Sequence, residues 1–214
     1  MALGPSIKRF LGPRLARRAG EYYRAIYVDL AKVAVALAPV IPRDAHVLDV
    51  GGGDGQPINH LLSVRPDLTI TTLDPAPAVG QWIDARYDDQ VKRLARTSLA
   101  EFVADPDAHA DVILIADVMH HIPKYARHRF LDSVSVLLDR VPRLLIIVKD
   151  VEPGHWLARL GFLSDRYVTG DRNVNLISRD SVTRLFEEEL GPLVCKETDL
   201  FKIDGPNYAM VFRR

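Results

Sequence analysis

Residues 47 to 55 read Val47-Leu48-Asp49-Val50-Gly51-Gly52-Gly53-Asp54-Gly55, an apolar run that turns directly into a glycine-rich segment. The apolar part, within residues 45–50, predicts a short strand. Glycine has no Cβ, so it permits a tight turn and lets the backbone approach a ligand closely. Ligands of open α/β sheets bind beyond the carboxyl ends of the strands. The stretch therefore predicts a strand followed by a ligand-binding loop and a helix.

Strand and helix patterns alternate along the chain around this loop. Short apolar runs predict strands at residues 45–50, 68–73, 91–95, 112–116, 144–148, 193–201 and 207–213. Apolar residues at helical spacing predict helices at 20–38, about 58–64, 79–86, 123–138 and 178–190. This alternation predicts a parallel sheet with helices on both faces. The last two strands lie too close in sequence for a helical crossover, so we expect them to be antiparallel.

The composition predicts one well-packed globular domain of 214 residues, 48% hydrophobic and 26% charged. Basic and acidic side chains both number 28, which argues against a nucleic-acid partner, because phosphate binding usually leaves a basic excess. The single cysteine, Cys195, excludes an internal disulfide and a multi-thiolate metal site. No apolar run is long enough to predict a membrane span, so we expect a cytoplasmic protein.

The N-terminal segment is basic, with five Lys or Arg residues among apolar ones before residue 19. Such a pattern is typical of a solvated helix or tail, and also of an amphipathic helix that contacts a membrane surface. Gly12-Pro13 interrupts any long helix here. Membrane contact through this segment therefore stays one alternative.

The type of ligand follows from the acids around the glycines. Asp74 ends the second predicted strand about 20 residues after the loop, where a carboxylate accepts hydrogen bonds from ribose hydroxyls. A dinucleotide such as NAD would suit this acid, but its fingerprint spaces the glycines G-x-G-x-x-G. Here the spacing is G-x-G-x-G, and the carboxylates of Asp49 and Asp54 would repel a pyrophosphate. They suit a ligand that carries an ammonium and a sulfonium.

The stretch from Val47 to Gly55 resembles motif I of the class I S-adenosylmethionine-dependent methyltransferases. The resemblance covers residues 45–150 well and the two ends in outline. It implies an α/β fold: a Rossmann-like, seven-stranded, mostly parallel sheet with helices on both faces and an antiparallel final strand. It also implies S-adenosylmethionine as the cofactor and an N-terminal helical cap (residues 1–42) before the methyltransferase domain (residues 43–214), with a lid insertion at about 151–177.

The resemblance assigns cofactor contacts residue by residue. Gly51, Gly53 and Gly55 would line the methionine part, and Asp49 would hold the amino group directly or through water. Asp74 would bind the ribose, and Pro75 or Ala76 would lie against the adenine. The further contacts that it implies are Ser98, Leu99 and Asp117. The family usually has an acid at the position of Ser98 and Leu99, and these two residues also fit an ordinary helix start.

Asp117-Val118-Met119-His120-His121-Ile122-Pro123 follows a buried predicted strand at the same edge. Histidine titrates near neutral pH and can take a proton from an attacking hydroxyl or amine. Adjacent histidines cannot point the same way, so one would face the cleft and the other would pack. His121 is the slightly preferred base over His120, and the alternative is that both are structural.

Some catechol-type methyltransferases bind magnesium through acids after the fourth and fifth strands, where this chain has Asp117 and Asp150. Their pattern continues with Asn, whereas Val151 follows here, so no metal is expected.

These features predict transfer of a methyl group to O, N or C of a small-molecule acceptor, such as a secondary metabolite. One alternative is a peripheral membrane methyltransferase acting on a lipid or quinone. Another is a protein that binds S-adenosylmethionine without catalysis. The sequence does not indicate the oligomeric state.

Overall fold

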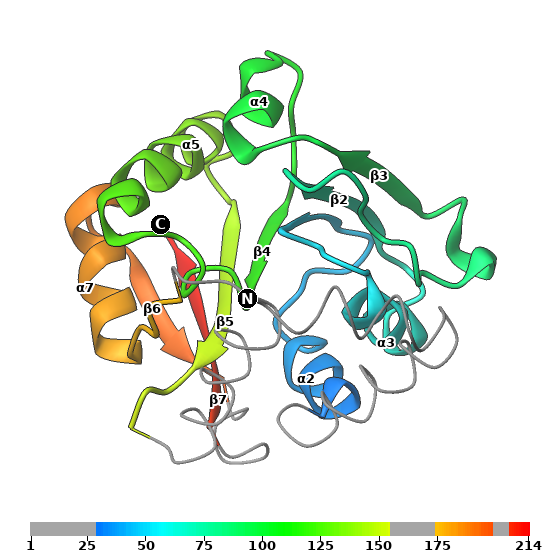
Figure 1. Ribbon diagram of the computed structural model, residues 1–214, viewed down its shortest axis with the longest axis horizontal. Helices are drawn as coiled ribbons and strands as arrows, with labels where there is room; N and C mark the ends of the chain where they lie inside the picture. The colour runs from blue at the N-terminus through cyan, green and yellow to red at the C-terminus, as the bar shows by residue number, and fades with distance from the viewer. Residues whose placement is uncertain (1–28, 155–173, 199–205) are drawn as a thin grey trace, which may run out of the picture.

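The computed structural model describes residues 29–154, 174–198 and 206–214. Seven strands form one sheet in the order β3-β2-β1-β4-β5-β7-β6 (Figure 1). Their bounds are β1 His46–Val50, β2 Thr69–Asp74, β3 Val91–Ala95, β4 Val112–Ala116, β5 Leu145–Val151, β6 Val194–Glu197 and β7 Asn207–Arg213. The first five strands pair in parallel, and β7 is antiparallel to both β5 and β6. The predicted fold class and the antiparallel closing pair are therefore confirmed.

Helices cover both faces of the sheet (Figure 1). Helices α2 (Leu30–Leu37) and α3 (Gln56–Val64) bury their apolar side chains on one face, together with β-strand residues such as Val47 and Val112. Helices α4 (Leu99–Ala104), α5 (Arg127–Arg140) and α7 (Arg179–Leu190) cover the other face. The central strands are buried on both sides, as their near-continuous apolar sequences require.

Local capping sets where the helices on the second face begin. Ser98 forms a capping box with Glu101 at the start of α4, with both reciprocal hydrogen bonds present. Ser178 caps α7 by accepting a hydrogen bond from the Ser181 backbone N–H, as its sequence position predicts. Pro123 precedes a short 3₁₀ turn, η2 (Lys124–Ala126), so α5 begins at Arg127 rather than at Pro123 itself.

The prediction of a helix at residues 79–86 is wrong. The segment contains only the 3₁₀ turn η1 (Ala85–Tyr87). Gly80 adopts a φ of +65°, a left-handed conformation that a continuing helix does not allow. Its N–H donates to Gly53 O at 2.9 Å, and Trp82 N–H donates to Asp54 O at 2.8 Å. The segment folds back onto the glycine loop because these long-range bonds replace helical ones.

Some predictions lie outside the described residues. These are the basic N-terminal segment, the part of the 20–38 helix before residue 29, and most of the 151–177 lid. Within the described part of the chain, no helix is long and apolar enough to cross a membrane.

Candidate active site

The carboxyl ends of the central parallel strands bring four acids to one edge of the sheet. Asp49 lies one residue before the end of β1, and Asp74 ends β2. Asp117 directly follows β4, and Asp150 lies next to the last residue of β5. Parallel pairing of β2, β1, β4 and β5 places these ends in order along the edge. The edge at which the sequence predicts ligand binding is therefore where these four acids gather.

The glycine loop is held against the end of β2 by its own backbone. The N–H groups of Gly51 and Gly52 both donate to Leu73 O, at 2.8 and 3.1 Å. Gly51, Gly53 and Gly55 all have positive φ, at +72°, +52° and +83°. A Cβ at Gly51 would lie 2.6 Å from Val118 Cγ2, so the loop after β4 packs directly on the glycine loop.

Gly52 is a site residue that the sequence prediction did not single out. A Cβ at this position would collide with the Thr72 hydroxyl and lie 2.5 Å from Asp49 Oδ2. Gly53 differs, because the nearest atom to a Cβ there is Gly51 O at 3.9 Å. The backbone of Gly52 therefore covers the buried carboxylate of Asp49, whereas a Cβ at Gly53 would make only an ordinary van der Waals contact.

Asp49 has an unusual environment for a carboxylate. Only 6% of the residue is exposed, and the Thr72 hydroxyl donates a hydrogen bond of 2.8 Å to Oδ2. Burial raises the pKa of Asp49 to about 6, and the hydrogen bond from Thr72 opposes that rise. A buried carboxylate of this kind would be stabilised in its ionised form by a cation. It fits the ammonium of S-adenosylmethionine, which the resemblance assigns to it.

Asp74 lies close to the glycine loop at the end of β2. Its Oδ2 accepts a hydrogen bond from Gly53 N–H at 3.1 Å, and its Oδ1 accepts one from Ala76 N–H at 2.7 Å. Pro75 is exposed beside it. Thr97 N–H donates to Asp74 O at 3.0 Å, which brings the segment after β3 to the same place. The structure thus brings the residues that are predicted to contact the ribose and the adenine to one place beside Asp74.

Ser98 and Leu99 form the start of helix α4, which the sequence offered as the alternative to a cofactor contact. The Ser98 hydroxyl donates to Glu101 Oε2 at 2.6 Å and accepts from Glu101 N–H at 3.2 Å. Leu99 is buried in the core, with 4% exposure. Their side chains are therefore engaged in capping and packing, and their cofactor contact stays a prediction.

Asp117 is fixed by a residue that sequence reasoning missed. Lys149, on β5, is 1% exposed, and its Nζ donates to both carboxylate oxygens of Asp117 at 2.7 Å. Asp117 N–H donates to Lys149 O at 2.8 Å, and Asp117 has a φ of +58°. The Asp117 side chain remains 42% exposed. A lysine within an otherwise apolar buried strand was the available signal.

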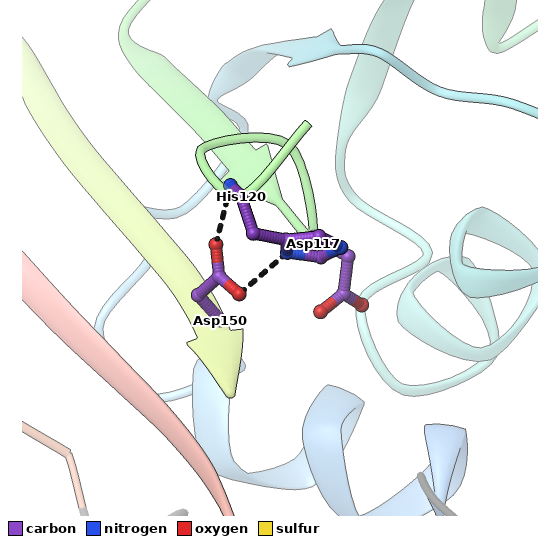
Figure 2. A group of neighbouring side chains, drawn as sticks. All are labelled: Asp117, His120 and Asp150. Atoms are coloured by element: carbon purple, nitrogen blue, oxygen red, sulfur yellow. Dashed lines mark hydrogen bonds and ion pairs between the residues drawn. The ribbon is translucent and has the colours of Figure 1, made fainter. Parts of the chain in front are cut away.

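The two adjacent histidines have different environments, one buried and one exposed. His120 is 5% exposed, whereas His121 is exposed. His120 Nδ1 lies 2.6 Å from Asp150 Oδ1, and His120 N–H donates to Asp150 Oδ2 at 3.3 Å (Figure 2). Asp150 is completely buried and also accepts from Val151 N–H at 2.8 Å. His120 is thus the packed histidine and His121 the exposed one, and the assignment of either as the base stays a prediction.

The cluster of Asp117, His120 and Asp150 offers three ligand atoms within 4.8 Å of one another. Hydrogen bonds account for this arrangement. Asp150 holds the imidazole, and the Lys149 ammonium binds both oxygens of Asp117, where its positive charge would oppose a second cation. We therefore assign none of these residues as a metal ligand.

The sheet order, the glycine loop after β1 and the acid at the end of β2 together define a nucleotide-type cofactor site on a Rossmann-like methyltransferase fold. A family model described as a methyltransferase domain matches residues 20–190, so the chain belongs to this family. The match confirms the predicted enzyme class, a methyltransferase. No curated protein sequence matches the chain.

Solved structures share the fold. A 1,6-didemethyltoxoflavin N1-methyltransferase from Burkholderia thailandensis, with its substrate and S-adenosylhomocysteine bound, is 17% identical, with a TM-score of 0.66 over 92% of this chain and 83% of its own. Mitomycin 7-O-methyltransferase is 21% identical, with a TM-score of 0.64 over 86% and 52%. Human N-acetylserotonin methyltransferase, in complex with S-adenosylmethionine, is 20% identical, with a TM-score of 0.61 over 87% and 52%. The chain spans about half the length of the last two.

Proposed function

We propose that this methyltransferase moves the methyl group of S-adenosylmethionine to an O, N or C atom of a small-molecule acceptor, with His120 as the general base. The observation that carries the proposal is the pairing of His120 Nδ1 with Asp150 Oδ1 at 2.6 Å, which joins strand β5 to the loop after β4, the loop whose Val118 packs against the glycine loop. The neighbouring structures support a small-molecule acceptor, because their substrates are of that kind.

The residues fit the cofactor in two respects. Asp49 presents a buried carboxylate that an ammonium would neutralise, and Gly51, Gly53 and Gly55 give the loop a left-handed backbone with no side chains to obstruct a ligand. Bound S-adenosylmethionine supplies a methyl group on a positively charged sulfur. Methyl transfer from such a group depends chiefly on alignment with the attacking atom, and a base is needed only where that atom carries a proton.

His120 would take that proton. Asp150 fixes the imidazole through Nδ1, so the tautomer with the proton on Nδ1 leaves Nε2 as the acceptor of a proton. The buried carboxylate then stabilises the imidazolium that forms, because opposite charges lie in contact in a water-poor environment. This is the base-and-orienter arrangement that general-base catalysis requires.

The test is S-adenosylhomocysteine formation with a panel of phenols, enols and heteroaromatic amines, followed by mass spectrometry. With an acceptor that gives product, His120→Gln should lower kcat by about 100-fold or more, with cofactor affinity retained. His121→Gln is the matched control, because His121 is the exposed neighbour, and its loss should be much smaller. Equal losses in the two variants would refute His120 as the base.

A further inference from the structure

Lys149 is a buried charge that the proposed methyl transfer does not itself use. It follows Leu145-Ile146-Ile147-Val148 on β5, and its side chain is 1% exposed. Removing an ammonium from water is expensive unless it is paired and hydrogen-bonded. Lys149 meets both conditions through the two 2.7 Å bonds to Asp117. An apolar residue would continue the strand at lower cost, so the pairing itself needs an explanation.

The partner of Lys149 lies next to the proposed base. A carboxylate oxygen of Asp117 and a ring nitrogen of His120 are within 4.8 Å of each other. Figure 2 shows the imidazole between two carboxylates, with Asp150 on one side and Asp117 on the other. Two uncompensated carboxylates at this range would both favour the imidazolium. A base must be neutral to accept a proton, so a second free carboxylate would hold it in the wrong state.

We propose that Lys149 is a positioning residue that neutralises the Asp117 carboxylate and holds it in place, so that the charge of Asp117 does not favour the imidazolium form of the neighbouring His120. Two further observations fit this role: Asp117 N–H donates to Lys149 O, and Asp117 has a left-handed φ. Both the backbone and the carboxylate of Asp117 therefore bind Lys149. The consequence for catalysis rests on the proposed function, whereas the electrostatic effect of Lys149 and Asp117 on His120 does not.

Other charged or titratable groups among the described residues lie around this cluster. On α5, Arg127 is buried and donates to Ile122 O and Asn175 O at 3.2 and 2.9 Å. The His121 ring centre lies 4.1 Å from that of His120. Tyr208 on β7 interacts electrostatically with Asp150, Glu152, Asp117 and Arg127, and Arg127 also interacts with Asp150. Because Tyr208 interacts with Asp117 as well, the test compares Lys149→Met, Asp117→Asn and the double variant, with all of these other residues left in place.

The test follows the His120 imidazole of the full-length protein by ¹H–¹⁵N NMR titration, with its signal assigned by loss in His120→Gln. Lys149→Met should raise the His120 titration midpoint by about one pH unit or more, because Asp117 is left uncompensated. Asp117→Asn should lower it, because the ammonium is then unpaired. The double variant should return the midpoint to within about 0.3 pH units of wild type.

An unchanged midpoint in folded Lys149→Met, or a double variant displaced as far as that single variant, would overturn the proposal. If Lys149→Met does not fold, the Asp117→Asn and double variants still decide, since an unchanged midpoint in Asp117→Asn overturns it as well. The proposed function fails separately, if His120→Gln keeps full kcat. A purely structural role for Lys149 predicts lower thermal stability without the opposed shifts.

Discussion

Asp49 should make cofactor affinity depend on pH in a predictable way. Its carboxylate is 6% exposed, and burial raises its pKa to about 6. The ionised form attracts an ammonium, whereas the protonated form does not. Cofactor binding should therefore weaken as the pH falls through 6, and binding below that pH should release a proton from Asp49.

The magnitude follows from the pKa. With a value of about 6, roughly nine-tenths of Asp49 is ionised at pH 7 and roughly one-tenth at pH 5. The dissociation constant should thus rise about tenfold between these pH values, which is about 1.4 kcal/mol. An α-amino group stays protonated throughout this range, so the cofactor ammonium adds no titration of its own.

Isothermal titration calorimetry at pH 5, 6 and 7 measures this dependence. Buffers of different ionisation enthalpy report the number of protons released. Asp49→Asn is the matched variant: it should bind more weakly at pH 7 and lose the tenfold dependence. An affinity that falls equally in wild type and Asp49→Asn would refute the assignment of the ammonium to Asp49.

Two further predictions concern Asp49 and the glycine loop beside it. Without cofactor, Asp49→Asn should raise the free energy of unfolding at pH 7.5 by up to about 3 kcal/mol. A carboxyl whose pKa is raised in the folded state stabilises the fold below its unfolded-state pKa near 4, and it loses that contribution as the pH rises through 6. Denaturant unfolding curves should show the gain from Asp49→Asn disappearing near pH 4, and a gain that persists there would contradict the reasoning. Gly52→Ala should weaken cofactor binding far more than Gly53→Ala, because the Cβ at residue 52 would collide with the Thr72 hydroxyl and approach the Asp49 carboxylate. A Cβ at residue 53 would make only an ordinary van der Waals contact, so Gly53→Ala would mainly incur left-handed strain of about 1–2 kcal/mol. Equal losses of affinity would show that the contacts of Gly52 do not matter.

The fold could be predicted from the sequence because its strands are short apolar runs with clear ends. The predicted bounds of β3, β4 and β7 agree with the structure. The segment at 79–86 could not be predicted, since its apolar residues fit a helix while bonds from Gly80 and Trp82 to the glycine loop decide its conformation. Such bonds join residues about 27 positions apart and leave no periodic pattern.

The candidate site likewise contains residues that could be identified from the sequence and pairings that could not. Asp49 and Asp74 were found because each lies where a predicted strand ends. The pairing of His120 with Asp150 and that of Asp117 with Lys149 link residues about 30 positions apart, so neither appears as a local motif. Lys149 stood at the end of an apolar run and was read simply as the end of the strand. A charged residue that continues such a run beside Asp150 is the signal that could have found it.

The most direct measurement of the central claim is calorimetric titration of the wild-type chain and Asp74→Ala with S-adenosylmethionine. Asp132→Ala, an exposed acid on α5, is the matched control. Wild type and Asp132→Ala should bind one equivalent with the same affinity, and Asp74→Ala should bind at least tenfold more weakly, because the ribose hydroxyls lose a charged acceptor. No binding by wild type, or equal affinity in all three proteins, would contradict the cofactor site at this edge of the sheet.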